Sequence, residues 1–239
     1  MTLVAAAVCP HPPLLVPEVA GAAAHELDEV REACGAAIDR LRAAGARHVV
    51  VLGSDRVTTA YDPPQHGSMR AYGAAVDIAL GPPDPLAPPP LPLSLTVGAW
   101  LLRRHPFGRP VTVGMCGLDG RMSSAECERF GADCTAEDPW ALLVMGDGSA
   151  RRGQKAPGYD DPRAKPYDDA VARALGSADI SFLAGLDPVL ADELMVAGRA
   201  PWQAMAETVR CTAVPWRGEL LYYGAPYGVA YFVAAWAPA

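Results

Sequence analysis

The sequence predicts an α/β fold in which helices flank one mixed central sheet. Three observations support this prediction. Short apolar runs rich in Val, Leu and Ala alternate with amphipathic segments of helical length, the first fifty residues have a strand–helix–strand order, and two strand-like runs around a Gly- and Pro-containing turn end the chain. With 239 residues, of which 51% are hydrophobic, the chain can bury one large core. We therefore predict a single domain over residues 1–239.

The first strand–helix–strand unit is the clearest part of the pattern. Residues 3–8 form an apolar run that is too short for a helix. Residues 25–44 carry apolar side chains at spacings of three and four, and Gly45 is placed to end that helix. Residues 48–52 form a second apolar run. Since a helix connects them, the two strands should be parallel.

The remaining elements follow from the same criteria. Residues 57–73 are expected to be a polar loop, residues 81–92 a stiff, proline-rich connection, and residues 150–165 a long loop without periodicity. Ser123 or Ser124 should cap a helix. The other expected strands are residues 74–80, 111–116, 140–145, 219–223 and 229–236, of which the last two form an antiparallel hairpin, and the other expected helices are residues 93–105, 123–133, 166–175, 187–196 and 202–209.

Composition excludes several classes of function. A net charge of −7, with no stripe of Arg or Lys, argues against binding to nucleic acid. No stretch approaches the roughly 18 apolar residues of a membrane span, so we expect a cytoplasmic protein that does not contact membranes. The six cysteines include no CxxC pair, which indicates free thiols rather than a zinc site or a disulfide framework. A small molecule is the expected partner.

A histidine lies on a rigid segment directly after the first strand. In the sequence Cys9-Pro10-His11-Pro12-Pro13-Leu14, three prolines fix φ and remove backbone donors around His11. Because the first two strands are parallel, His11 and the pair Asp55–Arg56 should face the same edge of the sheet, where open α/β sheets bind ligands. The alternative is that His11 caps a turn or fills a gap in the core.

Four patterns in order along the chain carry a resemblance to a known family. They are a strand followed by Pro-His, a strand ending in the polar turn Gly53-Ser54-Asp55-Arg56-Val57-Thr58, a Gly-rich turn at Gly146-Asp147-Gly148-Ser149, and a glutamate, Glu193, in a late helix. Taken together, they resemble the class III extradiol ring-cleavage dioxygenases, the superfamily of the protocatechuate 4,5-dioxygenase catalytic subunit, with Memo-like proteins as distant relatives. The resemblance implies a fold of the extradiol-dioxygenase type.

The resemblance also implies an iron site, which this sequence matches only in part. Family members hold Fe(II) with two histidines and a carboxylate, and a further histidine acts as acid and base. His11 corresponds to the first ligand and Glu193 to the carboxylate. Arg56 stands at the position of the second histidine, and Ser149-Ala150 stands where the acid/base histidine is expected.

These two departures lead to the main hypothesis. A guanidinium stays protonated and has no free lone pair, so Arg56 cannot bind iron. It could instead neutralise Glu193 through a bidentate hydrogen bond, in place of the charge of the metal. The sequence thus predicts a diverged member of the superfamily that binds a small anionic or aromatic ligand without ring cleavage.

Two other functions remain open at this stage. The first is an active metalloenzyme that binds Fe(II) or another divalent ion through His11, Glu193 and a substitute ligand, either Asp55 or His66. Against it, Asp55 could simply cap a turn or pair with Arg56. The second is a non-catalytic, Memo-like interaction protein. A homodimer formed through the apolar C-terminal hairpin is also compatible with the sequence.

The loop after residue 145 is the last candidate part of the site. Its position in the family pattern favours a wall of the pocket, with Ser149 and Arg151 placed to receive an anion. Lys155 and Tyr159 are then the candidates for proton transfer in place of the missing histidine. The alternative is a surface loop whose charges face water.

Overall fold

A seven-stranded mixed sheet, ordered β3-β6-β2-β7-β1-β9-β8, forms the centre of the molecule in the computed structural model, which describes residues 2–81, 90–136 and 139–239. The four central strands β6, β2, β7 and β1 are parallel, whereas β3, β9 and β8 each run antiparallel to the neighbour they pair with. A separate two-stranded sheet is made by β4 and β5. The strands are β1 (Leu3–Cys9), β2 (His48–Asp55), β3 (Thr59–Tyr61), β4 (Gln65–Ser68), β5 (Asp77–Leu80), β6 (Thr112–Asp119), β7 (Trp140–Met145), β8 (Trp216–Gly224) and β9 (Tyr231–Pro238).

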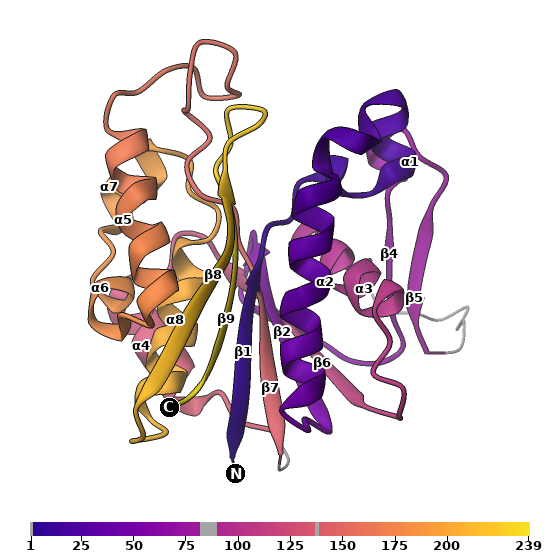
Figure 1. The fold of residues 1–239 in the computed structure, drawn as a ribbon, viewed down its shortest axis with the longest axis vertical. Coiled ribbons are helices and arrows are strands. Elements are labelled where there is room, and N and C mark those ends of the chain that lie inside the picture. Colours follow the sequence, from indigo (N-terminus) through magenta and orange to yellow (C-terminus); the bar gives the residue numbers. More distant parts are fainter. Residues whose placement is uncertain (1, 82–89, 137–138) are drawn as a thin grey trace.

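Helices cover both faces of the large sheet (Figure 1). On one face lie α2 and α3, and on the other lie α4, α5, α6 and α8. The α-helices are α1 (Pro17–Ala20), α2 (Asp28–Ala43), α3 (Leu93–Arg104), α4 (Ser124–Asp133), α5 (Ala164–Ser177), α6 (Ile180–Ala184), α7 (Pro188–Glu193) and α8 (Arg199–Arg210), and the 3₁₀ helices are η1 (Pro13–Leu15), η2 (Gly21–Leu27) and η3 (Arg70–Tyr72).

The sheet separates two hydrophobic layers, and β1 shows how the sequence builds both. Ala5 and Ala7 face the layer of α2 and α3, whereas Ala6 and Val8 face the layer of α8. This alternation follows from the two-residue period of a strand. In the second layer the buried ring of Trp202 packs edge-on against Phe232, with 5.6 Å between the ring centroids. The core thus holds the four parallel strands in place from both sides.

Most of the predicted elements are confirmed. The chain is a single α/β domain with a mixed central sheet and flanking helices, and β1 and β2 are parallel, with β7 lying between them. The C-terminal hairpin of β8 and β9 is antiparallel. Ser123, rather than Ser124, caps α4, where its side chain and that of Glu126 form a capping box.

Two predicted segments differ from the structure, and one helix was not predicted. The polar loop expected at residues 57–73 contains β3 and β4, because backbone pairing with β6 and β5 makes strands of a sequence without apolar alternation. The helix expected at residues 187–196 ends at Glu193, since the backbone of Met195 is left-handed with φ of 57°. The short helix α6 was not expected. In the connection expected at residues 81–92, residues 82–89 lie outside the described part of the chain.

The described residues contain no helix that is both long enough and apolar enough to cross a lipid bilayer.

Candidate functional site

The turns after the four parallel strands meet at one edge of the sheet, at the upper end of the strands in Figure 1. As predicted, His11 follows β1 and Asp55–Arg56 ends β2 at this same edge. The turn after β6 adds Arg121, and the turn after β7 adds Asp147. Ligands of open α/β sheets bind at this edge, so it is the candidate site.

A hollow of about 500 Å³ opens between the turns after β2 and β6 and the helix α7. We call it the carboxyl-edge cleft. Arg56, Arg121 and Arg199 contribute cationic side chains to its lining, and Asp55, Asp119 and Asp192 contribute carboxylates. The exposed side chain of Met195 and the neighbouring Val196 make part of the lining apolar. The cleft therefore combines three arginines and three carboxylates with a partly apolar wall.

Asp55 orders the turn that presents Arg56. One of its carboxylate oxygens, Oδ1, accepts the backbone N–H of Arg56 at 2.6 Å, and the other, Oδ2, accepts the hydroxyl of Tyr61 at 2.6 Å. Burial, together with this bond to a carboxylate, raises the pKa of Tyr61 above its usual range. Among the described residues the exposed guanidinium of Arg56 has no partner. Asp55 thus has the turn-capping role that the sequence left as an alternative.

The other arginines around the cleft differ in what they already bind. Arg199 is 2% exposed, and its guanidinium donates to the carbonyl oxygens of Gly120 and Met122, which fixes the turn after β6. The side chain of Arg121 is 83% exposed, with only a loose contact of 3.7 Å to Asp119. Among the described residues of the lining, Arg56 is therefore an unpaired cation and Arg121 a loosely paired one, and both can receive a ligand.

A second hollow lies on the other side of Arg56. It has a volume of about 410 Å³, and Tyr61, Tyr72 and Leu93 line it together with Arg56. The Arg56 side chain thus borders two neighbouring depressions, one with an aromatic wall and one with an aliphatic wall.

His11 is not among the residues that line the cleft, and it contacts the turn after β7. Its backbone N–H donates to Oδ1 of Asp147 at 2.8 Å, and its ring Nδ1 lies 3.8 Å from the same oxygen. The side chain is buried, and Nδ1 has no hydrogen-bond partner in the described structure. Burial raises the pKa of Asp147, although His11 acts in the opposite direction. The sequence predicted that His11 follows the first strand, but it did not identify Asp147 as its neighbour.

Ser149 does not face the cleft. It is fully buried, and both its backbone N–H and its hydroxyl donate to Asp168, at 2.9 and 2.5 Å. Arg152 donates to the same carboxylate at 3.1 Å and to the hydroxyl of Tyr223 at 3.0 Å. Burial raises the pKa of Asp168 despite these donors. This network, which the sequence did not reveal, anchors the loop after β7 to α5 and β8.

The predicted pair of Arg56 and Glu193 is not formed. Glu193 accepts a hydrogen bond from Arg163 at 2.6 Å instead, and its side chain is 49% exposed. Arg163 also binds Asp161, which lowers the pKa of Asp161 to about 2. The physical reason is position, because Arg163 precedes α5 directly beside the end of α7, whereas Arg56 projects from the turn after β2.

The other loop residues proposed for the site do not line the cleft. Arg151 donates to the carbonyl oxygen of Gly158 and so closes the loop on itself. Lys155 is exposed, and Tyr159 is 62% exposed with a left-handed backbone. None of these three side chains lines the carboxyl-edge cleft.

The proposed metal ligands are not gathered in one place. Over residues 2–81, 90–136 and 139–239, no three His, Cys, Asp or Glu side chains are placed to hold a metal ion. The carboxylate of Asp55 accepts a hydrogen bond from Tyr61, and that of Glu193 accepts one from Arg163. His66 lies in the separate β4–β5 sheet. The residues present therefore do not fit the Fe(II) site that the resemblance implies. All six cysteines are free thiols, as expected.

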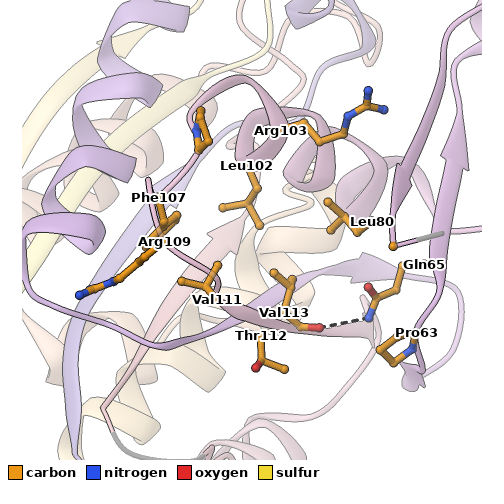
Figure 2. Close-up of a pocket in the computed structure, with 12 residues that line it drawn as sticks. Pro63, Gln65, Leu80, Leu102, Arg103, Phe107, Arg109, Val111, Thr112 and Val113 are labelled. Atoms are coloured by element: carbon orange, nitrogen blue, oxygen red, sulfur yellow. Dashed lines mark hydrogen bonds between the residues drawn. The ribbon is translucent and has the colours of Figure 1, made fainter.

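Figure 2 shows a different hollow, of about 530 Å³, at the opposite edge of the sheet, where β6 begins. Leu102, Phe107, Val111 and Val113 make its centre apolar, and Gln65 binds the Val113 carbonyl oxygen at 3.2 Å. The guanidinium groups of the two arginines drawn in Figure 2 extend away from this centre. Arg103 and Arg109 each donate to a backbone carbonyl oxygen, and none of the residues that the sequence predicts for the site lines this hollow, so the carboxyl-edge cleft remains the candidate site.

No protein-family model matches the sequence, and no curated protein matches it. Among solved structures, the chain is similar to the crystal structure of the uncharacterized protein JW3007 from Escherichia coli K12. The two share 12% sequence identity with a TM-score of 0.56, over 98% of this chain and 99% of that chain. The similarity therefore spans both chains from end to end and shows a shared α/β fold.

Proposed function

We propose that the protein is a diverged member of the class III extradiol dioxygenase superfamily that binds a small anionic ligand in the carboxyl-edge cleft without cleaving an aromatic ring. The ligand carries a carboxylate on an aromatic or apolar body. One observation carries the proposal, namely that the exposed guanidinium of Arg56 lines the cleft and has no partner among the described residues.

The chemistry of the cleft supports this class of ligand. A guanidinium binds a carboxylate through two parallel hydrogen bonds, and Arg121 adds a second positive charge. Met195 and Val196 offer apolar contact to the body of the ligand. Asp55, which could compete for Arg56, is already bound by Tyr61 and by the backbone.

The absence of ring cleavage in the proposal rests on the donor set. The family's reaction needs two histidines and a carboxylate around one iron, and here Arg56 stands at one of these positions while Arg163 binds Glu193. The arrangement of the described side chains thus favours binding over oxygen chemistry.

Thermal unfolding with three probes tests the proposal. We expect benzoate to raise the melting temperature, benzamide to have no effect, and cyclohexanecarboxylate to act like benzoate, because a ligand that binds only the folded state stabilises it. Arg56→Gln should weaken benzoate binding roughly tenfold to a hundredfold, since a hydrogen bond to a charged group contributes about 1.5–3 kcal/mol. Arg173→Gln, an exposed position on α5 outside the cleft, is the matched control.

Equal stabilisation by benzamide, or an unchanged response of the Arg56→Gln variant, would refute the carboxylate site. The metalloenzyme alternative is tested separately by anaerobic incubation of the whole chain with Fe(II). Near-stoichiometric iron that survives desalting would overturn the binding proposal in favour of an active enzyme.

A further inference from the structure

The strand β8 is an edge strand, and its outer side runs along the sheet without a pairing partner in the described part of the chain. It is the last strand in the order and has nine residues, whereas β3 at the other end has three. In the described part of the chain no strand pairs with its outer side. In Figure 1 it forms the near edge of the sheet. Unpaired edges of this length invite pairing with another strand, and proteins commonly shorten or cover them.

Helices α5 and α2 contact the two faces of β8, although a hollow of about 430 Å³ lined by Arg40, Arg217 and Glu219 remains on the α2 face. On one face α5 packs so closely that a Cβ on Gly218 would lie 2.5 Å from the carbonyl oxygen of Leu175. On the other face Arg40 of α2 binds Glu219 with Nη2–Oε2 and Nη2–Oε1 distances of 2.9 and 3.1 Å. In the described part of the chain, the outer side of β8 is thus open to a strand added beside it.

We propose that a second copy of this chain occupies the edge, with the two β8 strands paired antiparallel about Gly218. A two-fold axis at Gly218 makes the contact self-complementary, as in most homodimers. In this register Arg217 lies opposite Glu219 of the second copy, and Trp216 lies opposite Leu220 of the second copy. Charge therefore meets opposite charge and apolar side chain meets apolar side chain on every pair next to the axis.

The charges on the strand support this register. Arg217 is exposed and has no partner in the part of the chain that the structure describes. Glu219 is half exposed in its pair with Arg40, so it can accept a further donor. Opposite charges directly across an antiparallel pair stabilise it, whereas like charges destabilise it. In the dimer, Glu219 would be bound by an arginine from each copy.

The apolar pairs and the irregularity of the strand set the extent of the contact. Leu220 is 37% exposed, which is unusual for leucine inside a sheet, and Trp216 lies on the same side of the strand. The pairing of β8 with β9 changes register between Leu220 and Tyr222. A bulge at that point bends the strand, so the contact is confined to residues 216–220.

A charge-exchange experiment on the whole chain tests the dimer, with mass measured by light scattering during size exclusion at 100 µM. The wild type should have the mass of two chains. Arg217→Glu alone places like charges opposite each other, and so does Glu219→Arg alone, so each variant should dissociate at least tenfold more readily. An equimolar mixture of the two variants restores both opposite-charge pairs and should again form dimers. Arg129→Glu, on exposed α4, makes the same charge change elsewhere and should leave the dimer intact.

Three results would overturn the proposal. The first is a monomeric wild type, which would mean that the charges and the bulge serve only to protect the edge strand. The second is a single variant that dimerises like the wild type, and the third is a mixture of the two variants that stays monomeric. Hydrogen exchange of the wild type gives a readout that needs no variant. Amide protection in residues 216–220 should increase with protein concentration, and protection that is independent of concentration contradicts the paired edge.

Discussion

Asp168 shows how one carboxylate can hold a whole loop. It is fully buried and accepts hydrogen bonds from Ser149 and Arg152. Asp168→Asn keeps the shape but leaves the guanidinium of Arg152 facing an amide. We expect the free energy of unfolding to fall by about 3 kcal/mol, because breaking a buried ion pair leaves one charge uncompensated. The midpoint of urea denaturation measures this loss.

The matched control is Asp160→Asn, which changes an exposed carboxylate in the same loop. Its free energy of unfolding should stay within about 0.5 kcal/mol of the wild-type value, as is usual at surface positions. If both variants unfold at the wild-type midpoint, Asp168 does not anchor the loop.

For individual residues, positions along the chain were predictable from the sequence, but side-chain partners were not. The position of His11 at the sheet edge was predictable, because a proline-rich turn follows an apolar strand. The partner of Glu193 was not, since Arg56 and Arg163 are both arginines in polar segments and only the folded chain brings Arg163 beside α7. A buried acid such as Asp168 is equally hidden, because it lies in an ordinary amphipathic helix.

At the scale of elements, the start of α8 depends on a residue without a side chain. A Cβ on Gly198 would lie 2.2 Å from the ring of Trp202, and the ring is fully buried. Gly198→Ala must therefore displace the ring or the helix. We expect a loss of about 2 kcal/mol in the free energy of unfolding, typical of overpacking, measured by thermal or urea denaturation.

Gly114→Ala is the control for this change. Gly114 lies in β6, and a Cβ there would meet nothing within 4 Å. The free energy of unfolding of this variant should be close to that of the wild type. A comparable loss in both variants would contradict the contact with the Trp202 ring as the cause.

Short elements were the part of the fold that sequence patterns could not supply. Runs of apolar residues predict the buried strands β1 and β7, and the spacing of apolar residues predicts the helix α2. By contrast, β3 has three residues and exists because β6 offers it a pairing partner. Its stability is a property of the sheet and is not encoded in its own composition.

For the whole molecule, partly buried thiols make stability depend on alkaline pH. Burial raises the pKa of Cys116 and of Cys134 to about 11, whereas the pKa of a thiol in an unfolded chain is about 8.5. Between these values the unfolded state releases protons that the folded state keeps. The free energy of unfolding should therefore fall as pH rises from about 8.5 to 11, which urea denaturation at several pH values in that window measures.

Replacing both partly buried thiols in a Cys116→Ala/Cys134→Ala variant should make this decline shallower. Cys211→Ala, which changes an exposed thiol, should leave the slope as it is in the wild type. A wild-type midpoint that is constant across the window would contradict the expected linkage.

The Arg163–Glu193 contact has a consequence for the medium in which the protein works. Both side chains are about half exposed, and this pair ties α7, which carries one wall of the cleft, to the start of α5. Surface attractions of this kind weaken as dissolved electrolyte shortens the Debye length from about 8 Å at physiological ionic strength to about 3 Å at 1 M. Concentrated salt therefore acts twice, by competing for Arg56 and by loosening the wall opposite it.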